Sequence, residues 1–337
     1  MPTPSDIDHA LIQHCMSEAY GPSKAPVRLT ALHADASSAA FRIDADDGAA
    51  YFLELHRKGF DPAVLAMLAF LRHEQGIETV MAPLPTTNGQ LSVRSGDFDC
   101  VLYPFFEGAN ALARALSDAQ WTAFGAAMGA IHRSTVPEAL SASLPKERYA
   151  HHWREGVRRY QRRFINGLTG DDVVKRFFAF WEEHAEDIDT VVYRSEQLAS
   201  ILLERPPLRV PCHADLHAGN VLAGDDGQVR IVGWRTLMLA PKERDLMFIG
   251  GGVGHVWNRP EEEARFCEGY GRAEIDAVAL AYYRYEHIAK NILETCDLMF
   301  DAAASLEDRE EALRRMRNGF EPNDVVAIAH QSYDAVT

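Results

Sequence analysis

Residues 210–222 of the chain read Val210-Pro-Cys-His213-Ala-Asp215-Leu-His217-Ala-Gly219-Asn220-Val-Leu222. An apolar run ends here, polar residues follow on a short loop, and a strand pattern then resumes. A histidine, an aspartate two residues later and an asparagine five residues after that have the spacing used for phosphoryl transfer to a hydroxyl. In that chemistry Asp215 would accept the hydroxyl proton, Asn220 would hold Mg²⁺ and His213 would brace the loop. Such loops often serve only as turns, but the complete spacing favours a catalytic loop.

Short strands and turns dominate the first hundred residues. A hairpin with strands over 41–43 and 49–55 is predicted, because Asp47-Gly48 supplies the positive φ of a tight turn. Asp61-Pro62 predicts the start of a helix that Gly76 ends. Further strands, which complete an antiparallel sheet, are predicted over 77–84, 90–94 and 98–103.

Long amphipathic helices dominate the chain after Gly108. Ser117 and Gln120 predict a capping box at the start of one helix. Further helices are predicted over 150–163, over 171–204 and from about 261 to the end. Two differently built lobes are therefore expected.

Composition narrows the classes of function. The chain has 337 residues, of which 47% are apolar, and this length exceeds that of most single compact domains. A formal net charge of −15 disfavours binding to nucleic acid or to an anionic membrane. No secretory leader or long apolar span is evident, so a cytoplasmic location is expected. Five scattered cysteines without a C-x-x-C pair predict neither a disulfide framework nor a zinc site.

Several segments resemble the aminoglycoside phosphotransferase and choline-kinase-like family, in particular its spectinomycin phosphotransferase branch. The resemblance extends from about Ala45 to Tyr285 and is carried by HADLHAGNVL at 213–222, IVGWRT at 231–236 and LAPKERDLMFIGGG at 239–252. Upstream it is carried by YFLEL, HEQGI, APLPTTNGQL and LYPFFEG.

This resemblance implies an α+β, protein-kinase-like bilobal fold. Residues 1–104 would form a small antiparallel-sheet lobe, 105–108 a hinge, and 109–337 a helical lobe with the catalytic loop 210–222 and the substrate-side helices.

The resemblance also implies roles for single residues. Asp215 would be the catalytic base, Asn220 a metal ligand, and Asp245 an acid that braces the catalytic loop. Three further residues, His217, Tyr285 and Glu286, are candidates for substrate contact, and Tyr103 and Phe105 would line the hinge beside an adenine.

Three positions depart from the family pattern on the nucleotide side. Glu54 stands where the family has a lysine that pairs with the phosphates, so an attraction to phosphate becomes a repulsion. Each interaction between two unit charges is worth about 4 kcal/mol at ~4 Å and an effective dielectric constant near ~20. Gly233 stands where the family has the chief metal-binding aspartate, and Arg235 where a second acid is usual. Asn220 alone makes a poor Mg²⁺ site, because Mg²⁺ needs several oxygens in octahedral geometry.

These departures leave two hypotheses for the function. In the first, the protein is a repurposed member with degraded Mg-ATP machinery, without a cofactor or metal, and binds a natural-product-like small molecule in its interlobe cleft or transforms it through His213 and Asp215. In the second, it is an active ATP-dependent O-phosphotransferase that uses Mg-ATP to modify an aminocyclitol or similar hydroxyl compound. Under the first hypothesis, Glu54 and Arg235 are expected to face each other as a charge pair where phosphates and Mg²⁺ would otherwise bind. Tolerated variation at these positions is the alternative explanation.

Overall fold

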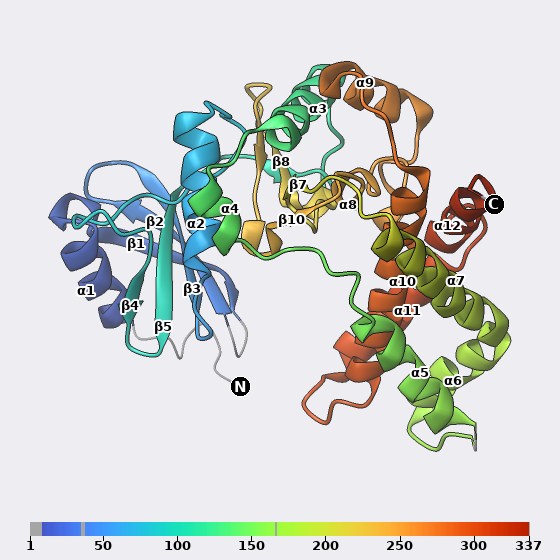
Figure 1. The fold of residues 1–337 in the computed structure, drawn as a ribbon. Coiled ribbons are helices and arrows are strands. Elements are labelled where there is room, and N and C mark those ends of the chain that lie inside the picture. Colours follow the sequence, from blue (N-terminus) through green and yellow to red (C-terminus); the bar gives the residue numbers. More distant parts are fainter. Residues whose placement is uncertain (1–8, 35–37, 166, 337) are drawn as a thin grey trace. The chain divides into compact units, whose positions relative to one another are not determined.

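The computed structural model describes residues 9–34, 38–165 and 167–336 and divides into two compact units. The first unit comprises residues 1–145 and 219–238, and the second comprises residues 146–218 and 239–337. Figure 1 shows an antiparallel sheet in the first unit and a predominantly helical second unit. This confirms the predicted α+β class. Residues 109–145 group with the N-terminal sheet, beyond the hinge that the sequence suggested at 105–108.

The sheet of the first unit has five antiparallel strands in the order β1-β2-β3-β5-β4. They are β1 (Pro26–Ala34), β2 (Ser38–Ala45), β3 (Ala50–His56), β4 (Val93–Ser95) and β5 (Phe98–Pro104). The predicted hairpin is confirmed as β2 and β3, with Gly48 at φ +78° in the turn between them. The strand predicted over 77–84 is wrong, since among the described residues only Val80 forms a bridge there. Prolines at 83 and 85 lack the amide N–H that a continuous ladder requires.

One face of β3 is buried in an apolar core, and the other face carries polar residues. Its odd-numbered residues, including Leu53 and Leu55, are buried in an apolar core with Met16 of helix α1 (His9–Ala19). Because side chains alternate along a strand, the even-numbered residues from Phe52 to His56 lie on the opposite face. That face carries the candidate nucleotide position Glu54.

Two helices of the first unit begin at the N-caps that the sequence predicts. Helix α2 (Pro62–Ala69) has Asp61 as its N-cap, and its last turn continues in π-helical form to Glu74. Helix α3 (Asp118–Arg133) has the predicted capping box between Ser117 and Gln120. The remaining elements of this unit are the short helix α4 (Glu138–Ser143) and a three-stranded sheet of β6 (Ala109–Asn110), β8 (Val221–Ala223) and β9 (Val229–Ile231).

The second unit is organised around helix α10 (Ala277–Met299), which packs against α8 (Glu243–Leu246) and against four longer helices. These four are α5 (His152–Phe164), α7 (Ala185–Glu204), α11 (Leu306–Gly319) and α12 (Val325–Asp334). The helix predicted over 171–204 is interrupted at His184, which leaves the helical conformation and separates α6 (Asp172–Glu183) from α7. Strands β7 (Val210–Cys212) and β10 (Met238–Ala240) pair, and helices α8 and α9 (Pro260–Tyr270) complete the unit.

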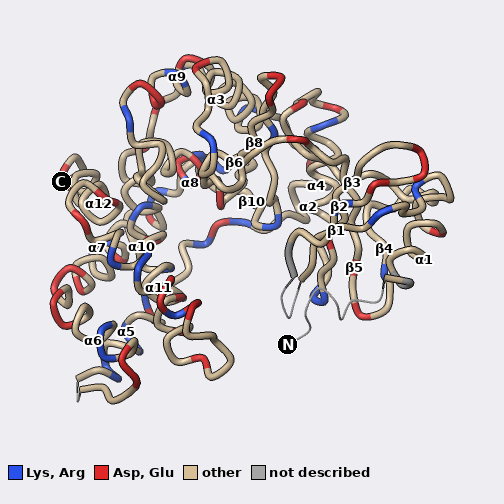
Figure 2. Tube along the Cα trace, turned by 180° about the vertical axis from the view of Figure 1, so that it is seen from behind, with Lys and Arg blue, Asp and Glu red and all other residues tan. Residues whose placement is uncertain are grey.

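Helix α11 carries both acidic and basic residues, with acids in its first turn and an arginine in its last turn (Figure 2). Within the described ranges, no helix combines the length and apolar character needed to cross a bilayer.

Candidate active-site loop and ligand pocket

Residues 210–218 of the predicted catalytic loop lie in the second unit, where Asp245 of α8 holds the backbone, whereas Asn220 belongs to the first unit. The Asp245 carboxylate accepts hydrogen bonds from the backbone N–H of His213 at 2.8 Å and of Ala214 at 2.7 Å. Ala214 has φ +67°, a left-handed conformation that is unfavourable for a residue with a Cβ. The buried His213 accepts a hydrogen bond at Nδ1 from the backbone N–H of Asp215 at 3.2 Å. Asp245 and His213 thus both hold backbone N–H groups of the loop, as a bracing role would require.

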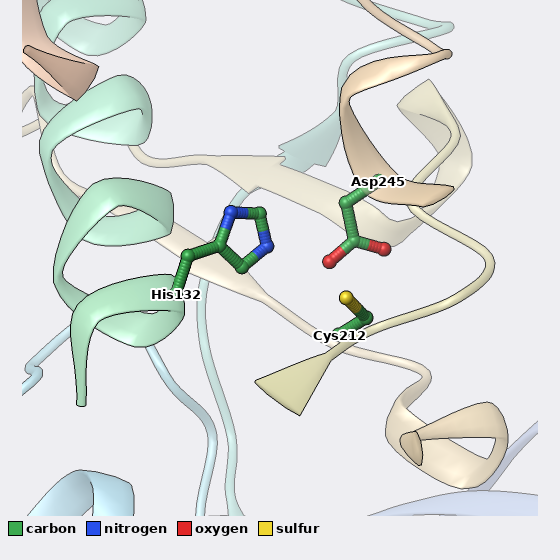
Figure 3. Close-up of side chains that lie close together, drawn as sticks. All are labelled: His132, Cys212 and Asp245. Atoms are coloured by element: carbon green, nitrogen blue, oxygen red, sulfur yellow. The ribbon is translucent and has the colours of Figure 1, made fainter. Parts of the chain in front are cut away.

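Cys212 lies beside the Asp245 carboxylate, as Figure 3 shows. Its thiol donates at 3.4 Å to the carbonyl oxygens of Ala240 and Pro241. Burial, reinforced by the nearby charge of Asp245, raises the pKa of the Cys212 thiol well above its usual value. The Cys212 thiol is consequently protonated near neutral pH.

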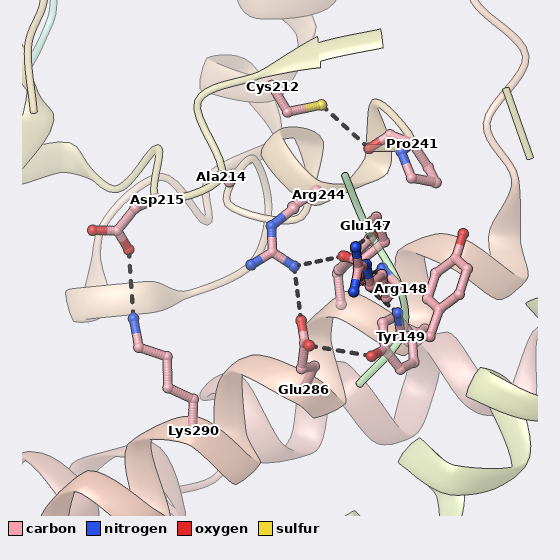
Figure 4. A network of polar contacts seen from close by, with 12 residues as sticks. Glu147, Arg148, Tyr149, Cys212, Ala214, Asp215, Pro241, Arg244, Glu286 and Lys290 are labelled. Atoms are coloured by element: carbon pink, nitrogen blue, oxygen red, sulfur yellow. Dashed lines mark hydrogen bonds and ion pairs between the residues drawn. The ribbon is translucent and has the colours of Figure 1, made fainter. Parts of the chain in front are cut away.

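Asp215 has a histidine and a lysine as neighbours within the second unit. Its carboxylate lies 3.6 Å from His217 Nε2 and 3.9 Å from Lys290 Nζ, and Figure 4 shows the contact with Lys290. Burial by itself would raise the pKa of Asp215, but the hydrogen bond from His217 and the charge of Lys290 outweigh burial and lower that pKa to about 2. The carboxylate is thus ionised throughout the physiological pH range.

Lys290 belongs to a polar face of α10 that the sequence interpretation missed. This face also carries His287, Asn291 and Glu294, and Lys290 Nζ lies 3.9 Å from Glu294 as well as from Asp215. Burial and the charge of Lys290 lower the pKa of His287 to about 4, so its ring is neutral near pH 7. The spacing of three and four residues along the helix was the signal that could have identified this face.

Tyr285 and Glu286, the predicted substrate contacts on α10, point into the core instead. The buried Tyr285 hydroxyl lies 3.0 Å from Arg194 and 2.7 Å from His330. Glu286 accepts from Arg244 at 2.9 Å within the network shown in Figure 4, and burial raises its pKa. The structure therefore supports a structural role for both side chains, whereas His217 remains at the loop beside Asp215.

A pocket of about 650 Å³ lies within the first unit. Its lining includes six aromatic residues: Phe52, Phe60, Tyr103, Phe105, Phe106 and Trp234. Its charged lining residues are Glu54, Lys58, Asp61 and Arg235, and Asn220 and Gly233 also contribute. The predicted nucleotide-side and hinge residues thus meet in one pocket.

The two hinge residues occupy the aromatic wall of this pocket. Tyr103 lies opposite Phe52 on the neighbouring strand, with ring centroids 6.2 Å apart, and burial raises the pKa of its phenol. The backbone N–H of Phe105 donates to the carbonyl oxygen of Ala50 at 3.0 Å. That amide is therefore used within the sheet.

His56 separates the charges of Glu54 and Arg235. His56 Nε2 lies 2.9 Å from Glu54 Oε1, while Arg235 Nη1 lies 2.6 Å from His56 Nδ1. Arg235 Nη1 also lies 2.7 Å from His56 Nε2, so the guanidinium contacts both ring nitrogens of His56. Among the described residues no ion pair joins Glu54 directly to Arg235, and the expected charge pair is instead bridged by a buried histidine.

Gly233 offers no room for a metal-binding side chain. Its backbone is left-handed, at φ +77° and ψ +31°. A Cβ at this position would lie 2.5 Å from Oδ1 of Asn220 and 2.8 Å from its Cγ. The amide of Asn220 therefore occupies the space that a side chain at position 233 would need, and Gly233 and Asn220 do not fit an octahedral Mg²⁺ site.

Replacing Gly233 with alanine is expected to lower the free energy of unfolding by about 1 to 3 kcal/mol, because the new Cβ combines a left-handed backbone with the contact at Asn220. Chemical denaturation measures this loss. Gly227 is the matched control, since it also has positive φ but a Cβ added there would meet no atom within 4 Å, so Gly227→Ala isolates the backbone contribution. Equal losses in the two variants would contradict the role of Asn220.

The chain is similar to known phosphotransferases in sequence and in structure. The family model described as the phosphotransferase enzyme family matches residues 28–283. Protein StrN of Streptomyces griseus is 28% identical over 210 residues, a match that covers 60% of this chain and 64% of StrN. The structure of spectinomycin phosphotransferase, APH(9)-Ia, in complex with ADP and spectinomycin is 32% identical, with a TM-score of 0.88 over 98% of this chain and 99% of that one. Amicoumacin kinase in complex with AMP-PNP and Ca²⁺ is 16% identical over 98% of this chain and 97% of its own, and its TM-score of 0.64 indicates likeness of fold alone.

Proposed function

Because the chain belongs to the phosphotransferase enzyme family, we propose that it is a repurposed member with degraded Mg-ATP machinery. In this proposal it acts in the cytoplasm, needs no cofactor, and binds or transforms a small natural-product-like molecule without conventional phosphotransfer. The observation that carries the proposal is the contact of Glu54 and Arg235 with His56 in the pocket of the first unit.

This contact opposes Mg-ATP binding for two reasons. A carboxylate at position 54 repels the phosphates that a lysine would attract, and Arg235 places a positive charge where a dication would have to bind. Phosphoryl transfer depends mainly on electrostatic stabilisation of the transferring group, so loss of the lysine and of the chief metal ligand should cost many decades of rate.

The state of Asp215 favours binding over acid–base catalysis within this proposal. A general base works best when its pKa lies near the operating pH, whereas the pKa of Asp215 is about 2. A permanently ionised carboxylate is instead well suited to accept hydrogen bonds from ligand hydroxyl or ammonium groups. The intact brace from Asp245 to the loop supports retention of this carboxylate for function.

The alternative is an active ATP-dependent O-phosphotransferase acting on an aminocyclitol or similar compound. It is favoured by the likeness to spectinomycin phosphotransferase, whose structure contains ADP and spectinomycin. It is also favoured by the order His213, Asp215, Asn220 in the loop, which the second hypothesis requires.

Isothermal titration calorimetry with ATP, with and without Mg²⁺, tests the proposal on the full-length protein. We expect no magnesium-dependent binding with a Kd below about 1 mM, because the phosphate and metal contacts are missing. Spectinomycin phosphotransferase serves as the positive control under the same conditions. Magnesium-dependent binding of ATP at micromolar Kd, or transfer of labelled phosphate from ATP to spectinomycin, would overturn the proposal in favour of the alternative.

A further inference from the structure

We propose that Cys15 and Cys100 form a redox-sensitive thiol pair, which hydrogen peroxide converts into a disulfide that ties helix α1 to strand β5. Neither residue lines the ligand pocket of the first unit, and the loop around Asp215 lies in the second unit. The inference therefore goes beyond the proposed function and does not depend on it.

The two cysteines come from different elements that share one apolar core. Cys15 lies in α1 and Cys100 in β5, and their exposed fractions are 5% and 1%. Helix α1 packs against β4 (Figure 1), and Cys100 is paired across the sheet with Val93 of β4. Because side chains alternate along a strand, Cys100 and Leu102 both face this core. The fold thus brings two cysteines that are distant in sequence to one place.

The two thiols are in contact with each other. Cys15 forms side-chain hydrogen bonds with Cys100 and with Ser95 of β4. The hydrogen bond with Cys100 favours the thiolate of Cys15 and, despite burial, lowers the pKa of its thiol. The same hydrogen bond, together with burial, raises the pKa of the Cys100 thiol. Cys15 is therefore the nucleophile of the pair, and Cys100 is the thiol that completes the bridge.

The other three cysteines lack this arrangement. The Cys212 thiol donates to backbone carbonyl oxygens, and burial raises its pKa and that of Cys296 well above the usual value. Cys267 is exposed on α9, and partial desolvation raises its pKa. The structure describes all five cysteines, and among them only Cys15 has a lowered pKa. Oxidation is consequently expected to begin at Cys15.

The reaction with hydrogen peroxide is balanced in two steps. The Cys15 thiolate attacks one peroxide oxygen, the O–O bond breaks, and a sulfenic acid and hydroxide form. The Cys100 sulfur then attacks the sulfenic sulfur, so that the S–S bond forms as the S–O bond breaks. The proton of the Cys100 thiol goes to the departing hydroxyl group, which leaves as water. The two sulfur atoms lose two electrons in total, and one peroxide becomes two waters.

Access of the oxidant depends on local opening of the core, because both side chains are almost fully buried. Hydrogen peroxide is small and uncharged, so it needs a smaller opening than a bulky thiol reagent. Once the sulfenic acid has formed, Cys100 already lies beside it. Bridge formation should therefore outcompete oxidation of Cys15 to the sulfinic acid.

The disulfide would close a long loop that contains strands β1 to β4 and helix α2. Such a cross-link restricts the unfolded chain more than the folded one, so the oxidised protein should be the more stable form. We expect its Tm to rise by at least about 3 °C after peroxide treatment and to return to the starting value after dithiothreitol.

Peptide mass spectrometry of the full-length protein after peroxide treatment under native conditions tests the bridge directly. Trypsin releases Cys15 in the peptide 1–24 and Cys100 in the peptide 95–114, each as its single cysteine. We expect these two peptides to be joined, with the loss of two hydrogens, in at least about half of the molecules. Dithiothreitol should separate them.

Three substitutions assign the roles of the thiols. Cys15→Ser and Cys100→Ser should each abolish the joined peptide and the rise in Tm. In Cys100→Ser the sulfenic acid has no partner, so dimedone should label Cys15 at least about fivefold more than it labels Cys100 in Cys15→Ser. Cys267→Ser is the matched control, because it removes an exposed, solitary thiol and should leave the joined peptide unchanged.

Three results would overturn the inference. The first is the absence of the joined peptide at peroxide concentrations that already oxidise Cys267. The second is a disulfide that joins Cys15 to another cysteine or to a second chain. The third is a bridge that forms only after the protein has been unfolded in urea, since the folded core would then not bring the two thiols into reactive contact.

Discussion

Asp245→Ala is expected to lower the free energy of unfolding by about 3 to 5 kcal/mol. The Asp245 carboxylate accepts from the two consecutive backbone N–H groups of His213 and Ala214, and each buried donor left without an acceptor costs about 1 to 3 kcal/mol. The left-handed backbone of Ala214 adds to the effect, since it depends on the same hydrogen bond to be held in place.

Urea denaturation of the full-length protein measures this loss. Asp225→Ala is the matched control, because the Asp225 side chain is exposed and pairs with Arg114 at the surface, so its removal should cost less than about 1 kcal/mol. A loss below about 1.5 kcal/mol for Asp245→Ala would show that the loop is held by other contacts.

Asp215→Asn is expected to weaken ligand binding or activity by at least about 100-fold. The substitution keeps the size of the side chain but removes the charge that lies 3.6 Å from His217 and 3.9 Å from Lys290. Under the proposed function this charge is the main hydrogen-bond acceptor for the ligand. Lys290→Met is the informative comparison, since it preserves the carboxylate and removes only its neighbouring cation. A fully functional Asp215→Asn protein would assign the loop a purely structural role.

The stability effect of Asp215→Asn should depend on pH. The pKa of Asp215 is about 2 in the folded protein, below the ordinary value of 3.8, so the ionised group stabilises the fold above about pH 4 and this contribution disappears as pH falls from about 4 to 2. After allowance for a side chain that is 29% exposed, the contribution near pH 7 is about 1 to 2 kcal/mol. The difference in Tm between the wild type and the variant should consequently shrink between pH 6 and pH 3. A difference that grows on acidification would contradict the assigned shift.

Local sequence signals predicted many elements and their ends. The turn at Asp47-Gly48, the N-cap Asp61 and the capping box of Ser117 with Gln120 depend on contacts between near neighbours, so residue types and spacing suffice. The predicted strand over 77–84 failed because its apolar pattern resembles a strand, although Pro83 has no amide N–H to donate within a ladder.

The roles of buried polar groups were harder to predict. Tyr285 and Glu286 are adjacent to His287, yet helical geometry turns the first two into the core and leaves Lys290, three residues beyond His287, beside Asp215. Whether a polar side chain of α10 is buried depends on the helices and loops that pack against it. Those elements are far apart in the sequence, so local residue patterns do not reveal the burial.

What the sequence determined by itself was the class of fold and the spacing of His213, Asp215 and Asn220 in the loop, whereas the loss of a family lysine and metal ligand at positions 54 and 233 stays a prediction. These conclusions follow from residue types at fixed spacing. Only the tertiary structure showed that His56 lies between Glu54 and Arg235. Glu54 and His56 are two residues apart in β3 and therefore lie on the same face of the strand, whereas Arg235, 179 residues after His56, contacts His56 only in the folded chain. Electrostatic partners depend on distances of a few ångströms, which a folded chain creates between residues that no sequence period connects.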